Sequence, residues 1–192
     1  MTDTHSGEFM FPLLTSRLVI RPFANDDIPQ FVEAVLESVN TVGRWLPWCT
    51  STYSTTEATD WFAFCDQCRQ AHTAVDLGIF DRTSERFLGG ISINEIQPIR
   101  QMGNIGYWVR QSMQGKGIAL EAVNSIAVYG FSQLKLTRLE IVAGEENGAS
   151  RRVAEKAGAH YEGIARNRII IRQQPIDAAL YSLVPANSLH AR

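Results

Sequence analysis

The sequence predicts an α/β (α+β) domain in which helices flank a mixed central β-sheet of about seven strands. Two observations support this class. Segments with the two-residue period of a strand alternate with segments that have the 3.6-residue period of a helix. The composition, 45% hydrophobic and 20% charged residues, is that of a globular protein. The 192 residues show no repeat, low-complexity run or linker, so we expect one domain over residues 1–192.

The first third of the chain predicts one strand and two helices. A short strand at Leu18–Ile20 precedes a helix with apolar positions from Ile28 to Val39, which Asn25 or Asp26 can cap. Ser54 and Glu57 then form the pattern of a capping box at the start of a second helix.

The middle of the chain predicts a hairpin and then a strand that feeds a helix. Val75 to Phe80 and Phe87 to Ile96 are two strands joined by a polar turn. Residues 105–109 alternate as a third strand, and helical periodicity begins at Ala119.

The last third predicts a strand, a helix and a final pair of strands. Residues 138–142 alternate, and Gly158 ends the helix that follows as its left-handed cap. Two strands, Tyr161–Arg172 and Asp177–Val184, are expected to turn at Gln174–Pro175. The complete predicted order is β-α-α-β-β-β-α-β-α-β-β.

The glycine-rich turn between the strand at 105–109 and its helix is the strongest functional signal. Backbone N–H groups at the start of a helix, together with the helix dipole, favour a phosphate or pyrophosphate. Gly115 and Gly117 let an anion approach the backbone closely. The pattern is not a P-loop, and Leu120 stands where a dinucleotide fingerprint has its third glycine. The predicted anion-binding residues are Gln114, Gly115, Lys116, Gly117, Ile118 and Ala119.

This turn fits Gln/Arg-x-x-Gly-x-Gly/Ala and resembles the pyrophosphate-binding turn of the GNAT superfamily of acyl-CoA-dependent N-acetyltransferases. Downstream, residues 147–158 and Glu162-Gly163 are similar to the Asn-x-x-Ser-x-Arg-x-x-x-Lys-x-Gly and Glu-Gly signature of its RimJ/RimL-type branch. Ala159 departs from that pattern, which usually has an aromatic residue there. The resemblance covers residues 105–181. It implies a GNAT fold, acetyl-CoA as co-substrate without a metal, and direct attack by a primary amine, most plausibly a protein N-terminus such as that of a ribosomal protein.

The resemblance also implies roles for individual residues. Backbone groups of Tyr107, Trp108 and Val109 would pair with the pantetheine arm, although core packing also accounts for Tyr107 and Val109. Asn147 would contact the same arm and cap its helix. Ser150 would protonate the departing thiolate, or only hydrogen-bond locally in the first helical turn. One of Arg151, Arg152 and Lys156 would meet a phosphate, and we select Arg151.

The general base is the least defined part of the predicted site. Asn104 stands where many relatives have a glutamate. Glu95 is the nearest alternative, because strand alternation places it on the face of Ile91 and Ile93, although a solvated strand-end charge is an equal interpretation. Ordered water, or an α-amine that is already neutral, would lower the need for a base.

Composition excludes several other classes of protein. A formal charge of −2 argues against a broad nucleic-acid-binding face, and no apolar run approaches the length of a membrane span. Residues 1–7 do not resemble a signal peptide, so we expect a cytoplasmic protein with reduced cysteines. Cys65, Cys68 and His72 share a helix face, but without a second ligand pair we expect no metal site.

Two functions from different classes stay open at this level. One is an enzyme that acetylates a protein N-terminus or, as a lesser alternative, a small-molecule amine. The other is an inactive acyl-CoA-binding sensor, which Asn104 favours. Trp45, Trp48 and Trp61 would either wall the acceptor site or pack in the core. The isoleucines at 169–171 predict a homodimer contact, because they cover both faces of one strand.

Overall fold

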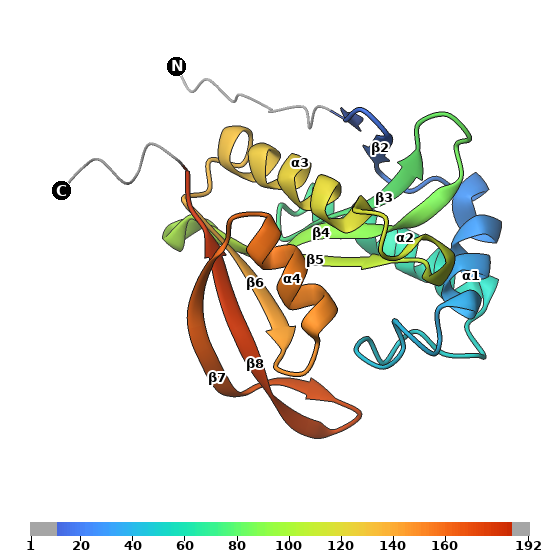
Figure 1. Cartoon of the computed structure of the whole chain (residues 1–192). Helices are drawn as coiled ribbons and strands as arrows, with labels where there is room; N and C mark the ends of the chain where they lie inside the picture. Colours follow the sequence, from blue (N-terminus) through green and yellow to red (C-terminus); the bar gives the residue numbers. More distant parts are fainter. Residues whose placement is uncertain (1–10, 186–192) are drawn as a thin grey trace, which may run out of the picture.

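The strands form one eight-stranded sheet in the order β1-β2-β3-β4-β5-β6-β8-β7 (Figure 1). The structure is a computed structural model that describes residues 11–185. Residues 1–7, for which no signal peptide is expected, lie outside the described residues. None of the described helices is long and apolar enough to cross a bilayer.

The observed elements follow the predicted order, with one strand added at the front. The added strand is β1, whose two residues pair with Val19 and Ile20 and make an eighth strand where about seven were expected. The strands are β1 (Leu13–Leu14), β2 (Leu18–Arg21), β3 (Val75–Asp81), β4 (Phe87–Gln97), β5 (Met102–Val109), β6 (Arg138–Gly144), β7 (His160–Ile171) and β8 (Gln174–Leu183). The helices are α1 (Ile28–Glu37), α2 (Thr55–Gln70), α3 (Ile118–Ser132) and α4 (Gly148–Lys156).

Local sequence signals predict the start of α2 and the end of α4 correctly, whereas the predicted start of α1 is wrong. Ser54 and Glu57 form the predicted capping box of α2. Gly158, with a φ of 79°, follows α4 as its left-handed cap. The predicted cap of α1 at Asn25 or Asp26 is wrong, because both lie in a 3-10 turn that precedes the helix.

The turn of the last hairpin also differs from its prediction. Gln174 and Pro175 already belong to β8, where they pair with β7. The turn is formed instead by Arg172 and Gln173, with φ of 48° and 66°. Two successive positive φ values give the tight turn whose twist matches that of the flanking strands.

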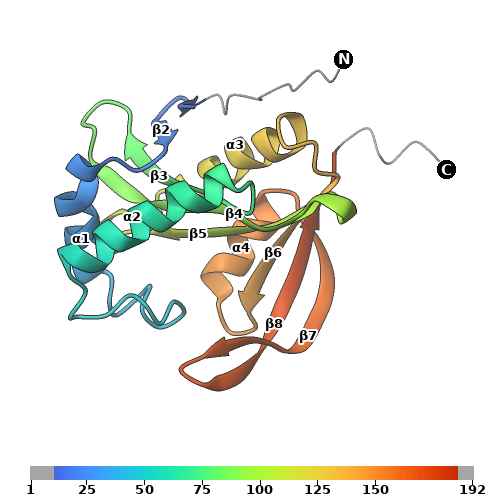
Figure 2. The ribbon, with the colours of Figure 1, turned by 180° about the vertical axis from the view of Figure 1, so that it is seen from behind.

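The helices divide between the two faces of the sheet, α3 and α4 on one and α1 and α2 on the other (Figures 1 and 2). Side chains of β5 alternate between two cores. Ile105 and Val109 pack in the core beneath α3 and α4, whereas Trp108 packs against the aromatic cluster of α1 and α2. Each face of β5 therefore opens towards a different layer.

The hairpin of β7 and β8 extends beyond the sheet, towards the long connection between α1 and α2 (Figure 2). At its tip the Arg172 guanidinium donates a 2.8 Å hydrogen bond to the carbonyl of Gly43 in that connection. Trp45 from the same connection lies against Gly144, at the end of β6. The connection and the hairpin thus form a bridge, on the α1/α2 side, between the two halves of the sheet.

Candidate active site

β5 and β6 begin as a parallel pair and then separate. Their pairing covers three rungs and ends at Asn104 opposite Glu140. On its other edge β5 stays paired with β4 as far as Val109. Residues 105–109 therefore border a gap on the β6 side, and the rung of Asn104 and Glu140 is the apex of this gap.

The hydrogen-bonding phase of β5 shows which backbone groups face the gap. The amide of Arg110 donates to the carbonyl of Leu88 just beyond β4, so alternate residues, including Trp108, direct their backbone groups towards β4. Tyr107 and Val109 then direct theirs towards the gap. The Gln114 side chain donates 2.9 Å to the Val109 carbonyl on that side. This geometry fits the pantetheine prediction at Tyr107 and Val109, whereas the backbone of Trp108 is turned away.

The glycine-rich turn lies at the open end of the gap. Gly115 and Gly117 have φ of 75° and 79°, a conformation in which glycine avoids the strain of a side chain. Gly117 is the N-cap of the 15-residue helix α3, so the amides of Ile118, Ala119 and Leu120 lack helical partners, and Glu121 is the first to donate within the helix, to the Gly117 carbonyl. A Cβ at Gly115 would meet nothing within 4 Å. The turn is therefore an exposed cradle of donors and fits a pyrophosphate.

Side chains remote in the sequence hold this turn in place. Arg110 is fully buried and forms ion pairs with Glu33 and Glu37 of α1. Glu37 also accepts hydrogen bonds from the amide and hydroxyl of Ser112. The hydrogen bond from Arg110, together with those from Ser112, lowers the pKa of Glu37 to about 2. Arg17 donates to the carbonyl of Lys116. Sequence reasoning missed these anchors, because nothing in a local pattern links residues that are 73 to 99 positions apart.

Ser150 contacts Tyr107 across the gap, and Asn147 contacts Ser150. The Asn147 side chain accepts from the Ser150 amide at 3.1 Å, so Asn147 does cap α4. The Tyr107 hydroxyl lies 2.9 Å from Ser150 Oγ and 3.0 Å from the Ser150 carbonyl oxygen. Burial raises the pKa of Tyr107 to about 12, so the phenol keeps its proton at neutral pH. A protonated hydroxyl pair thus lies between β5 and the first turn of α4.

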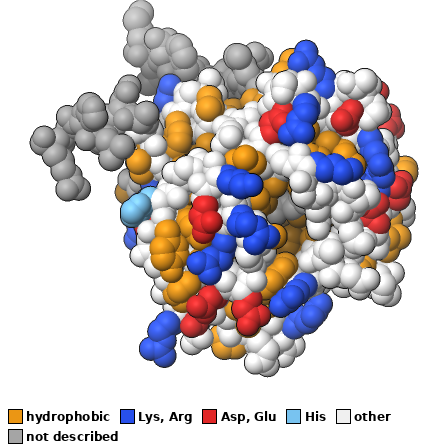
Figure 3. Space-filling model, in the orientation of Figure 1, with side chains coloured by type: hydrophobic (Ala, Val, Ile, Leu, Met, Phe, Trp, Pro, Cys, Tyr) orange, Lys and Arg blue, Asp and Glu red, His pale blue; other side chains and the backbone are white. Residues whose placement is uncertain are grey.

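The Arg151 side chain contacts other residues of the protein. Its guanidinium donates to the Tyr181 hydroxyl and to the carbonyl of Glu145, and it lies over the ring of Tyr161. These contacts do not favour the predicted phosphate contact of Arg151, whereas Arg152 is exposed on the same helix. The face that carries α3 and α4 is hollowed beside α4, and Lys and Arg side chains gather around this hollow (Figure 3).

Glu95 does not lie where strand alternation predicted. The pairing of β4 with β5 is interrupted between Asn94 and Gln97, and Glu95 takes a φ of 50° there. Its side chain is 62% exposed and lies 3.9 Å from Arg168. The prediction that it shares the face of Ile91 and Ile93 is wrong, because the bulge breaks the alternation. Glu95 instead lines a polar cavity with Asn104 and Glu140.

The three tryptophans have different surroundings. Trp45 covers Gly144, and Trp48 packs edge-on against Trp108 with ring centroids 5.5 Å apart. Both therefore lie beside the gap on the α1/α2 side. Trp61 packs with Phe64 and the core of α1 and α2, away from it.

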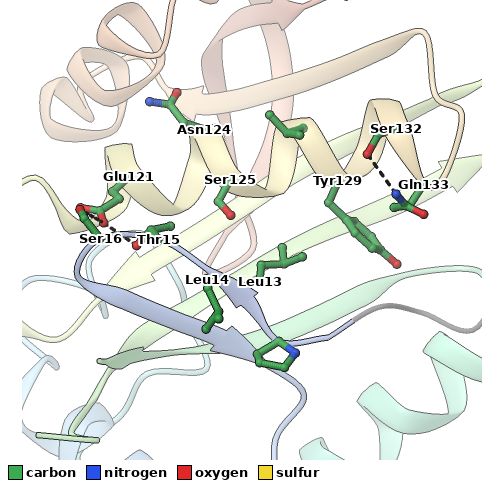
Figure 4. Close-up of a pocket in the computed structure, with 12 residues that line it drawn as sticks. Leu13, Leu14, Thr15, Ser16, Glu121, Asn124, Ser125, Tyr129, Ser132 and Gln133 are labelled. Atoms are coloured by element: carbon green, nitrogen blue, oxygen red, sulfur yellow. Dashed lines mark hydrogen bonds between the residues drawn. The ribbon is translucent and has the colours of Figure 1, made fainter. Parts of the chain in front are cut away.

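Two other features lie apart from the gap. Among residues 11–185 no group of three or more His, Cys, Asp or Glu side chains could hold a metal ion. A groove of about 620 Å³ runs between β1 and α3 (Figure 4). It is lined by Leu13, Leu14, Val128 and Tyr129, among others, and contains no predicted site residue.

Comparisons with known proteins agree with this geometry. The sequence profile of the acetyltransferase (GNAT) domain matches residues 17–160. "Putative ribosomal N-acetyltransferase YdaF" of Bacillus subtilis is 27% identical over 179 residues, which cover 89% of this chain and 93% of that protein. A structure described as "a putative ribosomal-protein-serine acetyltransferase from Vibrio cholerae" is 30% identical, with a TM-score of 0.81, and covers 91% of this chain and 98% of that one. RimL, an L7/L12 α-N-protein acetyltransferase solved with coenzyme A, has the same fold, with a TM-score of 0.81, 23% identity and coverage of 90% and 96%.

Proposed function

Because this chain belongs to the GNAT acetyltransferase family and to its RimJ/RimL-type branch, we propose that it transfers the acetyl group of acetyl-CoA to the N-terminal α-amine of a protein. The observation that carries the proposal is the gap between β5 and β6. It joins the anion-binding turn at Gly115 and Gly117 to the hydroxyls of Tyr107 and Ser150.

Each part of the gap has a defined task in this reaction. Amides at the start of α3 hold the pyrophosphate, and the backbone of Tyr107 and Val109 aligns the pantetheine arm. Acetyl-CoA supplies an activated thioester when it is bound. Ser150 gives its hydroxyl proton to the departing thiolate and regains one, through water, from the attacking amine, whose nitrogen loses a proton as the amide forms. The Tyr107 hydroxyl contacts both the hydroxyl and the carbonyl oxygen of Ser150, and these two contacts keep the Ser150 hydroxyl in position.

The shape of the α1/α2 side supports a chain end as the acceptor. The contact from Arg172 to Gly43 joins the hairpin to the α1–α2 connection, and Trp45 of that connection lies against Gly144. An extended N-terminus is narrow enough to approach a face enclosed on two sides by these segments, whereas a lysine on a folded surface brings its surroundings with it. A small-molecule amine is the second candidate acceptor, since it is also small enough to approach this face.

The test is to incubate the protein with acetyl-CoA and a panel of peptides with free N-termini, polyamines and aminoglycosides, while following thiol release. The proposal predicts turnover with peptides above that with the other amines. Turnover confined to small amines would move the acceptor to that class. Tight binding of acetyl-CoA without turnover of any acceptor would favour the inactive sensor.

We also propose that the protein forms a homodimer in the cytoplasm. β7 is an edge strand of the sheet, and Tyr161, Ile164 and Ile170 are exposed on it. Ile170, from the predicted contact segment, is 63% exposed. Light scattering would reveal a dimer that Ile170→Lys weakens, and a monomer at all accessible concentrations would contradict this proposal.

A further inference from the structure

A polar cavity of about 270 Å³ lies at the apex of the gap. Asn104 and Glu140, the last paired residues before β5 and β6 separate, both line it. Glu95, Arg100 and Arg168 complete its charged lining. The cavity is therefore placed at the end of the gap that is furthest from the anion-binding turn.

The cavity opens on the α1/α2 side of the sheet. Leu139 and Ile141, the neighbours of Glu140, pack in the core beneath α3 and α4, and so does Ile105 beside Asn104. Because side chains alternate along a strand, Glu140 and Asn104 point to the opposite face. This is the face bounded by the bridge and by Trp45, from which an acceptor would approach.

Glu140 is a carboxylate held in one orientation with one oxygen available. Arg138 donates to it twice, at 2.9 and 2.8 Å, and both bonds fall on Oε1. Among the described residues, no hydrogen bond reaches Oε2. The Glu140 side chain is only 15% exposed, so water screens its charge poorly. Such an oxygen is suited to accept a hydrogen bond from an N–H group.

Asn104 adds a second acceptor at the apex. Its Nδ2 donates 2.9 Å to Asn94, whose own amide donates to Ser92, so the orientation of the Asn104 amide is set. Its Oδ1 is buried and has no hydrogen-bond partner among the described residues. A buried acceptor without a donor is costly, and an amine N–H that reached it would remove that cost.

We propose that Glu140 is the residue that binds the acceptor amine at the apex, and that Arg168 receives a carbonyl oxygen of the same acceptor. This inference rests on the proposed function and specifies its acceptor. Two carboxylates and two guanidiniums line the cavity, so its charges balance. A peptide N-terminus brings one amine followed by carbonyl oxygens and matches this mixed lining. A polyamine brings several cations, which Arg100 and Arg168 would repel.

Glu162 provides a matched control for Glu140. It binds the same Arg138, at 2.7 and 2.6 Å, and this contact, with one from Ser182, lowers the pKa of Glu162 to about 2. Glu162 does not line the cavity. A variant at either glutamate disturbs the ion-pair network, but only Glu140→Gln changes the proposed amine contact.

The experiment measures KM and kcat with the peptide of highest turnover from the panel, and peptide binding to the protein loaded with coenzyme A by calorimetry. We expect Glu140→Gln to raise KM and weaken peptide binding by about tenfold or more. Glu162→Gln should leave both nearly unchanged, and Glu140→Asp should restore part of the affinity. Coenzyme A binding should be equal in all variants.

Equal effects of Glu140→Gln and Glu162→Gln would overturn the inference, because they would show that Glu140 acts only through Arg138. Arg168→Gln, at a partly exposed position, gives an independent test in case Glu140→Gln does not fold. It should weaken peptide binding while leaving spermidine binding unchanged or tighter, and an unchanged peptide affinity would also overturn the proposal. If the wild-type protein acetylates no acceptor, the proposed function is wrong. If it acetylates peptides but the Glu140 and Arg168 variants bind them normally, only this inference is wrong.

Discussion

The two ends of the gap between β5 and β6 are built in different ways. At the open end, backbone groups in a glycine-rich turn provide the binding surface, and buried side chains such as Arg110 serve to hold that backbone. At the apex, the groups that face the cavity are side chains from several strands, among them Asn104, Glu140 and Arg168. A constant ligand can be bound by the backbone, whereas an acceptor that differs between relatives is best selected by side chains.

The largest expected effect is on kcat and concerns Ser150, which lies between the two ends of the gap. Ser150→Ala should lower kcat by about 10²–10⁴-fold, because the departing thiolate loses its proton donor, and should leave acetyl-CoA affinity nearly unchanged. Tyr107→Phe removes the neighbouring hydroxyl while retaining Ser150, and a smaller loss is expected. A fully active Ser150→Ala variant would show that Ser150 only hydrogen-bonds locally, and Tyr181 or water would then be the next candidate.

The second prediction tests how firmly the open end is held. Arg110→Met removes the buried cation that joins β5 to α1, and leaves Glu37 without its partner. We expect a loss of about 3–5 kcal/mol in the free energy of unfolding, measured with urea, and weaker binding of acetyl-CoA. Arg44→Met is the control, because it breaks the exposed pair with Glu146 and should cost at most about 1 kcal/mol. Equal losses in the two variants would contradict the anchoring role.

The third prediction separates anion binding from backbone strain in the turn. Gly117 and Gly158 both have a φ of 79° and no close contact that a Cβ would strike. Valine at either position should lower stability through the same left-handed strain. Only Gly117→Val should also weaken acetyl-CoA binding, by about tenfold or more, since its side chain projects where the pyrophosphate approaches. If calorimetry shows equal affinities for acetyl-CoA in the two variants, the phosphates do not bind at this turn.

The smallest expected effect is on stability and concerns the α1/α2 side of the sheet, from which an acceptor would approach. Asp76 interacts there with Ser92. Burial raises the pKa of Asp76 to about 6, above its ordinary value of 3.8. Between these pH values the unfolded chain releases its proton before the folded one, so stability falls as pH rises from about 4 to 6. Asp76→Asn should therefore stabilise the protein by about 1–3 kcal/mol at pH 7 and by nothing below pH 3.8. A gain that does not depend on pH would contradict this account.

The contrast between the two ends also explains how far the sequence could predict the site. The turn from Gln114 to Ala119 is a contiguous pattern, and its glycines are needed for backbone geometry, so it could be found in the sequence. Glu140 and Arg168 come from separate strands, and no spacing links them. The orientation of Glu95 was predicted wrongly because a bulge in β4 leaves no clear mark in the sequence. Except for the two-residue strand β1, the order of elements was predictable, because apolar periodicity determines it.

Hydrogen exchange at the amides of β5 tests the central claim most directly, namely that the gap binds acetyl-CoA through its backbone. Tyr107 and Val109 have amides that face the gap, whereas the amide of Trp108 faces β4. Adding coenzyme A should slow exchange at Tyr107, Val109 and the first amides of α3, and leave Trp108 as slow as before. Unchanged exchange at Tyr107 and Val109, while coenzyme A is bound, would contradict the account.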